Sequence, residues 1–209
     1  MIKDKYDMSS LNDLYHMSDK DINKFAFTLA CAFKGYALFE YFSSYKYNEK
    51  KMIEFWKVML KASKKRAIHL ATDDGCESVA VVFEPGYKGP SIFSYLRYGG
   101  LKLIFMFGLF SIKRMMKFEN FANRVKKEFV KNNTWYFYSL AVSPNRQGQG
   151  EASKLVRPLL KFLKDNNQTC YLETLNETNV DIYEHYGFNL VATTFVPNSD
   201  LTLYGMVKE

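Results

Sequence analysis

The sequence predicts an α/β (α+β) fold in which helices flank a central, partly antiparallel sheet. Strand-like and helix-like segments alternate along the chain, and two short strand patterns meet at Asp74-Gly75, which is a hairpin signal. Of the 209 residues, 47% are hydrophobic, which is enough to bury a sizeable core. This length suggests one domain over 1–209, with 1–130 as an elaborated first half and 134–209 as the second.

The first two predicted elements are amphipathic helices with recognisable starts. Ser18 and Asp21 form a capping-box pattern at the start of a helix over 19–33. Asn48 can cap a second helix over 49–65, whose apolar residues keep helical spacing.

The remaining elements follow from hydrophobic periodicity and turn residues. In chain order they are strands 67–75 and 78–86, helices at about 92–108 and 111–130, strand 134–142, helix 150–165, strand 169–174, helix 179–186, and strands 188–196 and 201–207. Inside helix 150–165, Pro158 removes one amide donor and clashes with the carbonyl of Lys154, so a kink is expected there.

The longest apolar run, "LIFMFGLFSI" at 103–112, lies between Lys102 and Lys113. A bilayer span needs about 20 such residues, so this run is too short and no membrane partner is predicted. We expect a core helix or an apolar wall beside a substrate site. An interfacial helix with the basic stretch 113–118 at its end is the alternative.

The formal net charge of +7 is unevenly distributed. Lys and Arg dominate 43–67 and 102–131, whereas acidic residues dominate 170–209. The asymmetry could attract an anionic cofactor, or it could reflect solvated helix faces. The basic stretches carry neither zinc-ligand spacing nor an RNA-recognition pattern, so no nucleic-acid partner is predicted.

The cysteines and the first residues indicate a cellular location. Cys31, Cys76 and Cys170 are far apart and odd in number, which argues against a disulfide framework and a metal cluster. The opening "MIKDKYDMSS" has no apolar segment typical of a signal peptide. A cytoplasmic protein without a bound metal is expected.

The segment 142–163 predicts an anion-binding loop. Strand 134–142 is followed by Gly148 and Gly150, which permit left-handed torsions and close approach of a ligand to the main chain. The first amides of the following helix lack partners inside the helix, and its dipole adds positive potential there. A P-loop does not fit, because Glu151 follows Gly150, and a dinucleotide fingerprint does not fit, because position 153 is serine.

Two motifs resemble the GCN5-related N-acetyltransferases (GNAT). "QGQGEA" at 147–152 resembles the family signature Gln/Arg-x-x-Gly-x-Gly/Ala. "YLETLNETNVDIYEHYGFNLV" at 171–191 resembles a later family motif, in which Asn is followed by Tyr seven residues on and then by Glu-x-x-Gly-Phe. The matching residues are Gln147, Gly150, Ala152, Asn176, Tyr183, Glu184, Gly187 and Phe188. The resemblance implies a largely antiparallel central sheet flanked by helices.

The resemblance also implies that acetyl-CoA is the cosubstrate and that 134–209 is the half that binds it, with 1–130 on the substrate side. Its pyrophosphate would contact the loop 147–153, and its pantetheine arm would pair with the strand before that loop. Asn176 occupies the place of a family side chain that often bonds the arm, although it could cap a turn instead, as could Asn179. The implied cofactor-binding residues are Leu140, Ala141, Val142, Gln147, Gly148, Gln149, Gly150, Glu151, Ala152, Ser153, Asn176 and Asn179.

The implied reaction is direct acetyl transfer from a thioester to a neutral amine. Tyr183 occupies the general-acid position of the family, and an unperturbed tyrosine pKa of about 10 keeps the proton available at neutral pH. The alternative role of Tyr183 is core packing beside Phe188. A strand amide near Leu140 or Val142 could stabilise the oxyanion.

The general base and the acceptor stay open. Strand 134–142 has no carboxylate, so Glu173, Glu84, water or no base are the candidates, and His69 and His185 rank lower. The acceptor could be a small primary amine, an aminoglycoside-like antibiotic or a peptide N-terminus, and a longer acyl donor is compatible. An exposed strand at 201–207 could pair across a homodimer. A sensor or interaction protein that binds acyl-CoA without turnover is the alternative function.

Overall fold

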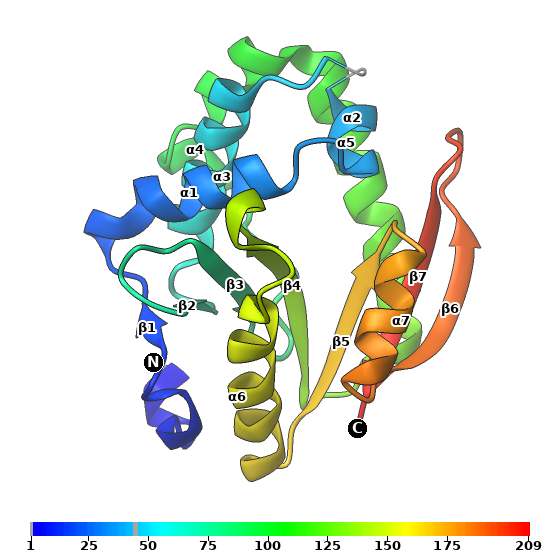
Figure 1. Ribbon diagram of the computed structural model, residues 1–209. Coiled ribbons are helices and arrows are strands. Elements are labelled where there is room, and N and C mark those ends of the chain that lie inside the picture. The colour runs from blue at the N-terminus through cyan, green and yellow to red at the C-terminus, as the bar shows by residue number, and fades with distance from the viewer. Residues whose placement is uncertain (1, 44–45) are drawn as a thin grey trace.

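The computed structural model describes residues 2–43 and 46–209 (Figure 1). In this part of the chain, seven strands form one sheet in the order β1-β2-β3-β4-β5-β7-β6. Neighbouring strands pair antiparallel except β4 and β5, which pair parallel. The predicted α/β fold with a largely antiparallel sheet is therefore confirmed. The strands are β1 (Tyr15–His16), β2 (Ala67–Ala71), β3 (Ser78–Phe83), β4 (Thr134–Val142), β5 (Thr169–Thr174), β6 (Asn189–Phe195) and β7 (Thr202–Lys208).

Helices cover both faces of the sheet, and each face has its own core. The α-helices are α1 (Ile22–Ala32), α2 (Ala37–Phe42), α3 (Glu49–Ser63), α4 (Ile92–Arg97), α5 (Gly100–Phe129), α6 (Glu151–Asp165) and α7 (Thr178–His185). One core joins α1, α2, α3 and the start of α5 to β2, β3 and β4. The other joins α6, α7 and the first residues of the chain to the opposite face, and Figure 1 shows α6 and α7 in front of the sheet. Short 3-10 helices lie at Ile2–Asp4, Ser9–Leu11, Asp19–Asp21 and Pro144–Arg146.

The predicted helix starts are confirmed by their caps. Ser18 and Asp21 form a capping box at the 3-10 turn that leads into α1. The Asn48 side chain accepts a hydrogen bond of 3.0 Å from the amide of Lys51 at the start of α3. The predicted helix at 150–165 runs through Pro158 as one element.

The strands β4 and β5 pair over a short distance and then separate. Their register covers only 134–136 against 169–171. Beyond this point β5 continues beside β7, and Figure 1 shows an opening between β4 and β5. The far end of β4 therefore keeps β3 as a neighbour on one edge and has no paired strand on the other.

A β-bulge interrupts β4 at the same place. Val81 pairs with Ser139 and Val82 pairs with Phe137, so Tyr138 is one extra residue in β4. Because side chains alternate between the two faces of a strand, one extra residue turns every following side chain to the opposite face. Ser139 therefore faces the α1–α3 side of the sheet, as its partner Val81 does.

The prediction of a core helix at 103–112 is wrong. These residues lie in α5, where Gly108, with φ 80° and ψ 154°, interrupts the helical torsions. Leu103 is buried, whereas Phe105, Leu109 and Phe110 are exposed. A run with Ser111 as its one polar residue places apolar side chains on all sides of a helix, and only one side of this helix packs on the protein. The described residues contain no helix that is long and apolar enough to cross a membrane.

Several further elements differ from the predictions. The helices predicted at about 92–108 and 111–130 are α4 and α5, which are separated at 98–99 and not at 109–110. The strand at 201–207 is β7, which lies between β5 and β6 and is not an exposed edge; the edge strand at that end of the sheet is β6. The strand predicted over 67–75 ends at Ala71, because Asp73–Gly75 belong to the turn of the hairpin. The helix α2 and the two-residue strand β1 were not predicted, since both are too short to show a period.

Candidate active site

A cavity of about 100 Å³ occupies the opening between β4 and β5. Strand β4 supplies the bulged region, β5 supplies its last residues, and α7 and α5 each supply one face. Aromatic side chains of α2, of α3 and of the connection between α1 and α2 close the remaining side. This β4–β5 cavity is lined by Phe33, Tyr36, Leu38, Phe39, Trp56, Phe118, Glu119, Tyr136, Phe137, Tyr138, Ser139, Leu140, Glu173, Thr174, Leu175, Asn179 and Tyr183.

Two buried polar atoms of the cavity wall have no partner. Nε1 of Trp56 and Oγ of Ser139 make no hydrogen bond to any described residue, although their side chains are only 2% and 5% exposed. A buried polar group without a partner costs about 1–3 kcal/mol, so such atoms in a cavity wall are suited to a bound ligand. The bulge at Tyr138 brings the Ser139 hydroxyl to this side of the sheet.

The free edge of β4 offers main-chain groups to the same opening. The Ser143 amide donates a hydrogen bond of 2.7 Å to the Glu77 carbonyl of the neighbouring chain segment. In an antiparallel pair every second residue hydrogen-bonds to the partner strand, and the residues between turn their main-chain groups away from it. Ala141 therefore turns its main-chain groups toward β3. Leu140 and Val142 turn theirs toward the opening, where an extended ligand could pair with them.

The glycine loop after β4 is open on its outer side. Gly148 and Gly150 have φ values of 74° and 78°, and a Cβ atom at either position would meet no atom within 4 Å. The amides of 148–152 donate to no main-chain acceptor in the described residues, whereas the Ser153 amide donates to the Gly150 carbonyl. The predicted anion site thus has five unpaired amides at the start of α6.

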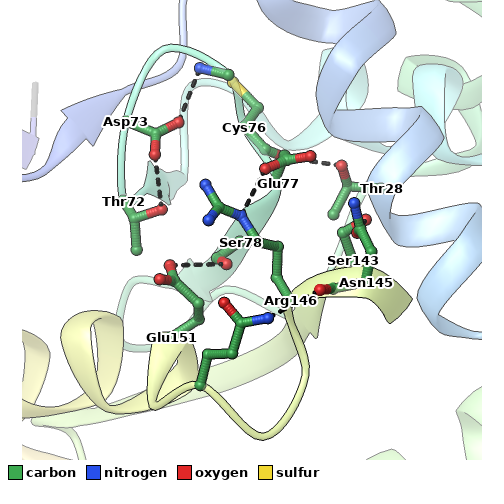
Figure 2. Close-up of polar contacts among 12 residues, drawn as sticks. Thr28, Thr72, Asp73, Cys76, Glu77, Ser78, Ser143, Asn145, Arg146 and Glu151 are labelled. Carbon is green, nitrogen blue, oxygen red and sulfur yellow. Dashed lines mark hydrogen bonds and ion pairs between the residues drawn. The ribbon is translucent and has the colours of Figure 1, made fainter.

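Side chains hold this loop against β3, as Figure 2 shows. Nε of Arg146 lies 2.7 Å from a carboxylate oxygen of Glu77, and the Ser78 hydroxyl donates to Glu151 at 3.3 Å. The Glu151 carboxylate is buried and also pairs with Lys154 at 2.7 Å. Glu151 therefore directs its side chain into the protein and can offer only its main chain to a ligand.

Two glutamine side chains complete the loop. Nε2 of Gln147 donates to the Val142 carbonyl at 3.2 Å, and Nε2 of Gln149 donates to the Asn145 carbonyl at 2.9 Å. Both side chains therefore shape the loop in this structure. The signature residue Gln147 ties the loop to the last residue of β4.

The two predicted asparagines lie in different environments. The Asn176 side chain accepts a hydrogen bond of 3.1 Å from the Thr178 amide, so it makes the turn cap that was the alternative to a cofactor contact. The Asn179 side chain donates to the Thr174 hydroxyl at 3.1 Å and lines the β4–β5 cavity. Asn179 is thus better placed to meet a ligand there.

Tyr183 lines the cavity from α7 and also packs on the core. Its ring contacts Phe137 and Phe188 edge to face, with centroid distances of 6.4 and 5.8 Å. Burial raises the pKa of the Tyr183 hydroxyl above its usual value. In the described part of the chain, this hydroxyl has no hydrogen-bond partner, so its proton is free to be donated.

The two predicted base candidates are separated by the structure. The Glu173 carboxylate lines the cavity and accepts hydrogen bonds from Tyr136 at 2.8 Å and Tyr171 at 3.2 Å. Burial raises the pKa of Glu173. Glu84 is not among the lining residues, and its carboxylate pairs with Arg66 and, at 3.6 Å, with Lys5.

Glu119 is a cavity residue that sequence reasoning missed. It lies on α5 and faces the same cavity as Glu173. Burial, followed by the charge of Glu173, raises the pKa of Glu119 to about 7, although Lys126 acts in the opposite direction. In the sequence Glu119 lies within the lysine-rich stretch 113–127, which reads as a solvated helix face. The buried neighbours Phe118 and Ala122 were the available signal.

The histidines lie apart from the cavity. His69 is buried on β2 and hydrogen-bonds to the Ser63 hydroxyl at 3.1 Å, and burial lowers its pKa to about 3. His185 is exposed at the end of α7. Over 2–43 and 46–209, no group of three or more His, Cys, Asp or Glu side chains could hold a metal ion.

The chain is similar in sequence to known acetyltransferases. Residues 114–188 match the model of a family described as the acetyltransferase (GNAT) family. An uncharacterized N-acetyltransferase of Schizosaccharomyces pombe is 27% identical over 199 residues, which cover 91% of this chain and 80% of that protein. The family match includes Glu119, the glycine loop, Glu173 and Tyr183.

Solved structures share the fold. Arylalkylamine N-acetyltransferase 2 from Aedes aegypti has a TM-score of 0.62 and 15% identity, with 93% of this chain and 97% of that chain covered. A protein from Corynebacterium glutamicum described as histone acetyltransferase HPA2 and related acetyltransferase has a TM-score of 0.59 and 16% identity, with 93% and 94% covered. At these identities the likeness concerns the fold alone.

Proposed function

We propose that this chain, which belongs to the acetyltransferase (GNAT) family and is an acetyltransferase, transfers an acetyl group from acetyl-CoA directly to a primary amine. One observation carries the proposal. The free edge of β4 runs from a cavity that holds a tyrosine and two carboxylates to the unpaired amides of the glycine loop that follows Val142. A thioester donor with an extended arm and a pyrophosphate matches this combination.

The residues present fit such a donor. The amides of 148–152 would hold the pyrophosphate, and the absence of side chains at Gly148 and Gly150 leaves room for it. The main-chain groups of Leu140 and Val142 would pair with the pantetheine arm, and Asn179 lies beside its path. When bound, acetyl-CoA supplies the activated acetyl group as a thioester.

In the proposed reaction an N–C bond forms and the thioester C–S bond breaks. An acceptor ammonium group loses two protons in total, of which one ends on the departing sulfur and one reaches the solvent. Tyr183 would donate the proton to the sulfur, because its raised pKa keeps the hydroxyl protonated at neutral pH. One of the two cavity carboxylates, Glu173 or Glu119, would accept a proton from the amine, directly or through water.

Further assignments belong to the same proposal. Residues 1–130 would form the acceptor side and 134–209 the donor side of one domain. The free cysteines at 31, 76 and 170 support a reducing, cytoplasmic location. Homodimer formation stays a prediction, and the exposed edge strand β6 is the element that could pair across it.

Binding of the donor should be measured first, by isothermal titration calorimetry with acetyl-CoA. Gly150→Asp should weaken the affinity by at least about tenfold, or about 1.4 kcal/mol, because it places a negative charge beside the pyrophosphate. Gly150→Ala is the matched control, since it brings the same left-handed strain without the charge. No binding to the wild-type protein would sink the proposal.

Turnover should then be measured with a panel of amines and with Tyr183→Phe. Transfer to an amine that falls about 100-fold in the variant supports direct transfer with Tyr183 as the acid. Tight acetyl-CoA binding without transfer to any amine favours the alternative, a sensor or interaction protein on the same fold.

A further inference from the structure

A second cavity of about 310 Å³ adjoins the β4–β5 cavity. It lies between α4 and α5 and is walled mainly by aliphatic and methionine side chains, among them Ile92, Leu96, Leu103 and Ile104. Glu119 lines both cavities and so marks the place where they meet. We call this second space the α4–α5 cavity.

The charges in the α4–α5 cavity are few and separated. Among the described residues that line it, Glu119 and Lys88 are the charged ones. The carboxylate of Glu119 lies at the side shared with the β4–β5 cavity. Lys88 belongs to the loop before α4, together with Gly89 and Pro90. The cavity therefore offers one negative group next to an apolar wall.

The charged groups around Glu119 carry an excess of one negative charge. Glu173 on β5 faces it with a second carboxylate, and Lys126 on the same helix supplies one ammonium group. Tyr95 on α4 and Tyr138 on β4 feel its charge, which contributes to their raised pKa values. With both carboxylates ionised, this cluster has a net charge of −1, which a single cation would balance.

We propose that the α4–α5 cavity is the acceptor site, that it takes a primary amine carried on an apolar alkyl or aryl body, and that Glu119 binds the ammonium group and accepts its proton. This inference rests on the proposed acetyl transfer. It assigns Glu119 as a catalytic residue, because the carboxylate would contact the reacting nitrogen.

The lining of the α4–α5 cavity discriminates among amines of different polarity and charge. An aminoglycoside would bury many hydroxyl groups against a mainly apolar wall, where Tyr95, Asn120 and Asn123 supply few polar partners and each hydroxyl left without one costs free energy. A polyamine would carry a second ammonium group toward Lys88, which repels it, and the lining described here has no second carboxylate at that end. An apolar body is stabilised by burial, at about 25 cal/mol per Å².

The proton transfers balance as follows. The ammonium group gives one proton to the Glu119 carboxylate, and the neutral nitrogen then forms the N–C bond while the C–S bond breaks. The nitrogen loses its second proton to the solvent, and the departing sulfur takes the proton of Tyr183. Tyr183 regains a proton from the solvent and Glu119 releases one to it. The net change is one proton released for each acetyl group transferred.

The pKa of Glu119 fits this role. Its raised value, about 7, makes the carboxylate a stronger base than a solvated glutamate while it stays largely ionised above that pH. Binding of an ammonium group next to it would lower the pKa and favour the ionised form.

The first test compares acceptors at saturating acetyl-CoA. n-Hexylamine and 2-phenylethylamine should have kcat/KM values at least about tenfold above those of ethanolamine and spermidine, which is the discrimination that a few buried methylene groups provide. Saturation-transfer NMR of n-hexylamine with the protein alone gives a second readout that needs no turnover. Equal or better use of the polar amines overturns the inference.

The second test fills the cavity. Ile104→Trp should raise the KM for n-hexylamine about tenfold and leave kcat/KM for methylamine within about twofold, because methylamine does not reach the apolar wall. Leu109→Trp is the matched control, since Leu109 lies on the same helix, is exposed and lines neither cavity. An equal loss for both amines in Ile104→Trp, with unchanged acetyl-CoA affinity, contradicts the inference.

The third test concerns Glu119 itself. Glu119→Gln should lower kcat/KM for n-hexylamine about 100-fold and remove the Glu119 titration from the acidic limb of its pH profile, which then reports the second carboxylate, Glu173. Glu119→Asp should restore part of both the rate and that titration. Unchanged kcat/KM in Glu119→Gln rejects the role of this carboxylate. A protein that binds no acetyl-CoA or acetylates no amine fails the proposed function instead, so the two failures are distinguishable.

Discussion

The Tyr136 hydroxyl donates a hydrogen bond of 2.8 Å to Oε1 of Glu173 and so connects β4 to β5 at the place where the two strands stop pairing. Tyr136 lies in the last paired position of β4, and Glu173 lies two residues beyond its counterpart Tyr171. The hydrogen bond therefore fixes a cavity carboxylate to the closed end of the strand opening.

Loss of this hydrogen bond should affect both stability and pH dependence. Tyr136→Phe removes a bond to a charged group and should lower the free energy of unfolding by about 1.5–3 kcal/mol. Because the hydroxyl lowers the pKa of Glu173, its removal should raise that pKa and move the acidic limb of kcat/KM to higher pH. Urea unfolding and a pH–rate profile measure the two effects. Tyr171→Phe should shift the limb in the same direction, and an unchanged limb in both variants excludes Glu173 from catalysis.

The unpartnered hydroxyl of Ser139 predicts a gain of stability at the cost of function. Ser139→Ala removes a buried group that has no partner, so the free energy of unfolding of the unliganded protein should stay equal or rise by up to about 1 kcal/mol. The affinity for acetyl-CoA or acceptor should fall, because a ligand loses that hydroxyl as a partner.

Ser63→Ala is the matched control for Ser139→Ala. Ser63 is equally buried but hydrogen-bonds to His69, so its replacement should destabilise the protein by about 1–3 kcal/mol. Thermal unfolding with and without acetyl-CoA separates the two serines. A Ser139→Ala protein that is as strongly destabilised as Ser63→Ala shows that Ser139 has a structural partner.

Buried His69 should make the protein less stable in mild acid. Its pKa is about 3 in the folded protein and about 6.5 when unfolded, so the unfolded chain binds the proton more readily. The contribution of neutral His69 to the free energy of unfolding is fully present above pH 6.5 and is lost as the pH falls from 6.5 toward 3. At pH 5 the loss should be about 2 kcal/mol.

His69→Gln removes this titration and keeps a polar group near Ser63. The difference in free energy of unfolding between wild type and variant, measured by urea unfolding at pH 7 and pH 5, should shrink or reverse at the lower pH. Glu119 has a raised pKa, so its titration makes the protein more stable as the pH falls from 7 to 4.5. This effect is the same in wild type and variant and cancels in the difference between them. Parallel pH dependence of the two proteins contradicts a neutral buried His69.

The hydrogen bond from Ser78 to Glu151, which holds the start of α6 against β3, should contribute about 1 kcal/mol to the free energy of unfolding. Ser78→Ala removes the hydroxyl that donates to the buried Glu151 carboxylate, which then keeps Lys154 as its partner. We expect a lower urea midpoint and a modestly weaker affinity for acetyl-CoA, because the start of α6 is less firmly held. Ser153→Ala is a control at the same turn, since its hydroxyl contacts only the exposed Arg157.

Local patterns were sufficient to predict the glycine loop and the strand and helix on either side of it. Strand 134–142, the loop glycines and the amphipathic helix 150–165 follow one another within the chain, and the structure has them as β4, Gly148, Gly150 and α6. Each of these features depends on periodicity or on the torsions that glycine permits, and both can be read from neighbouring residues.

The proposed acceptor side depends on contacts between distant segments. Glu119 lies on α5 and meets Glu173 of β5 only because α5 packs across the sheet, which no local spacing shows. The exposed apolar residues Phe105 and Phe110 could not be distinguished from core residues, because the unbroken run gives no face. The place of β7 between β5 and β6 is likewise a matter of topology.

The extra residue Tyr138 changes which face of the sheet the odd-numbered side chains of β4 point to. Odd-numbered side chains point to the α6 side at 135 and 137, and odd-numbered side chains point to the α1–α3 side at 139 and 141. Deleting this single residue would restore regular alternation of side chains along the whole strand. Ser139 would stay opposite Val81 on the α1–α3 side and Leu140 opposite Ala80 on the α6 side, so the bulge gives the cavity side of β4 one more side chain, that of Tyr138, than a regular strand would.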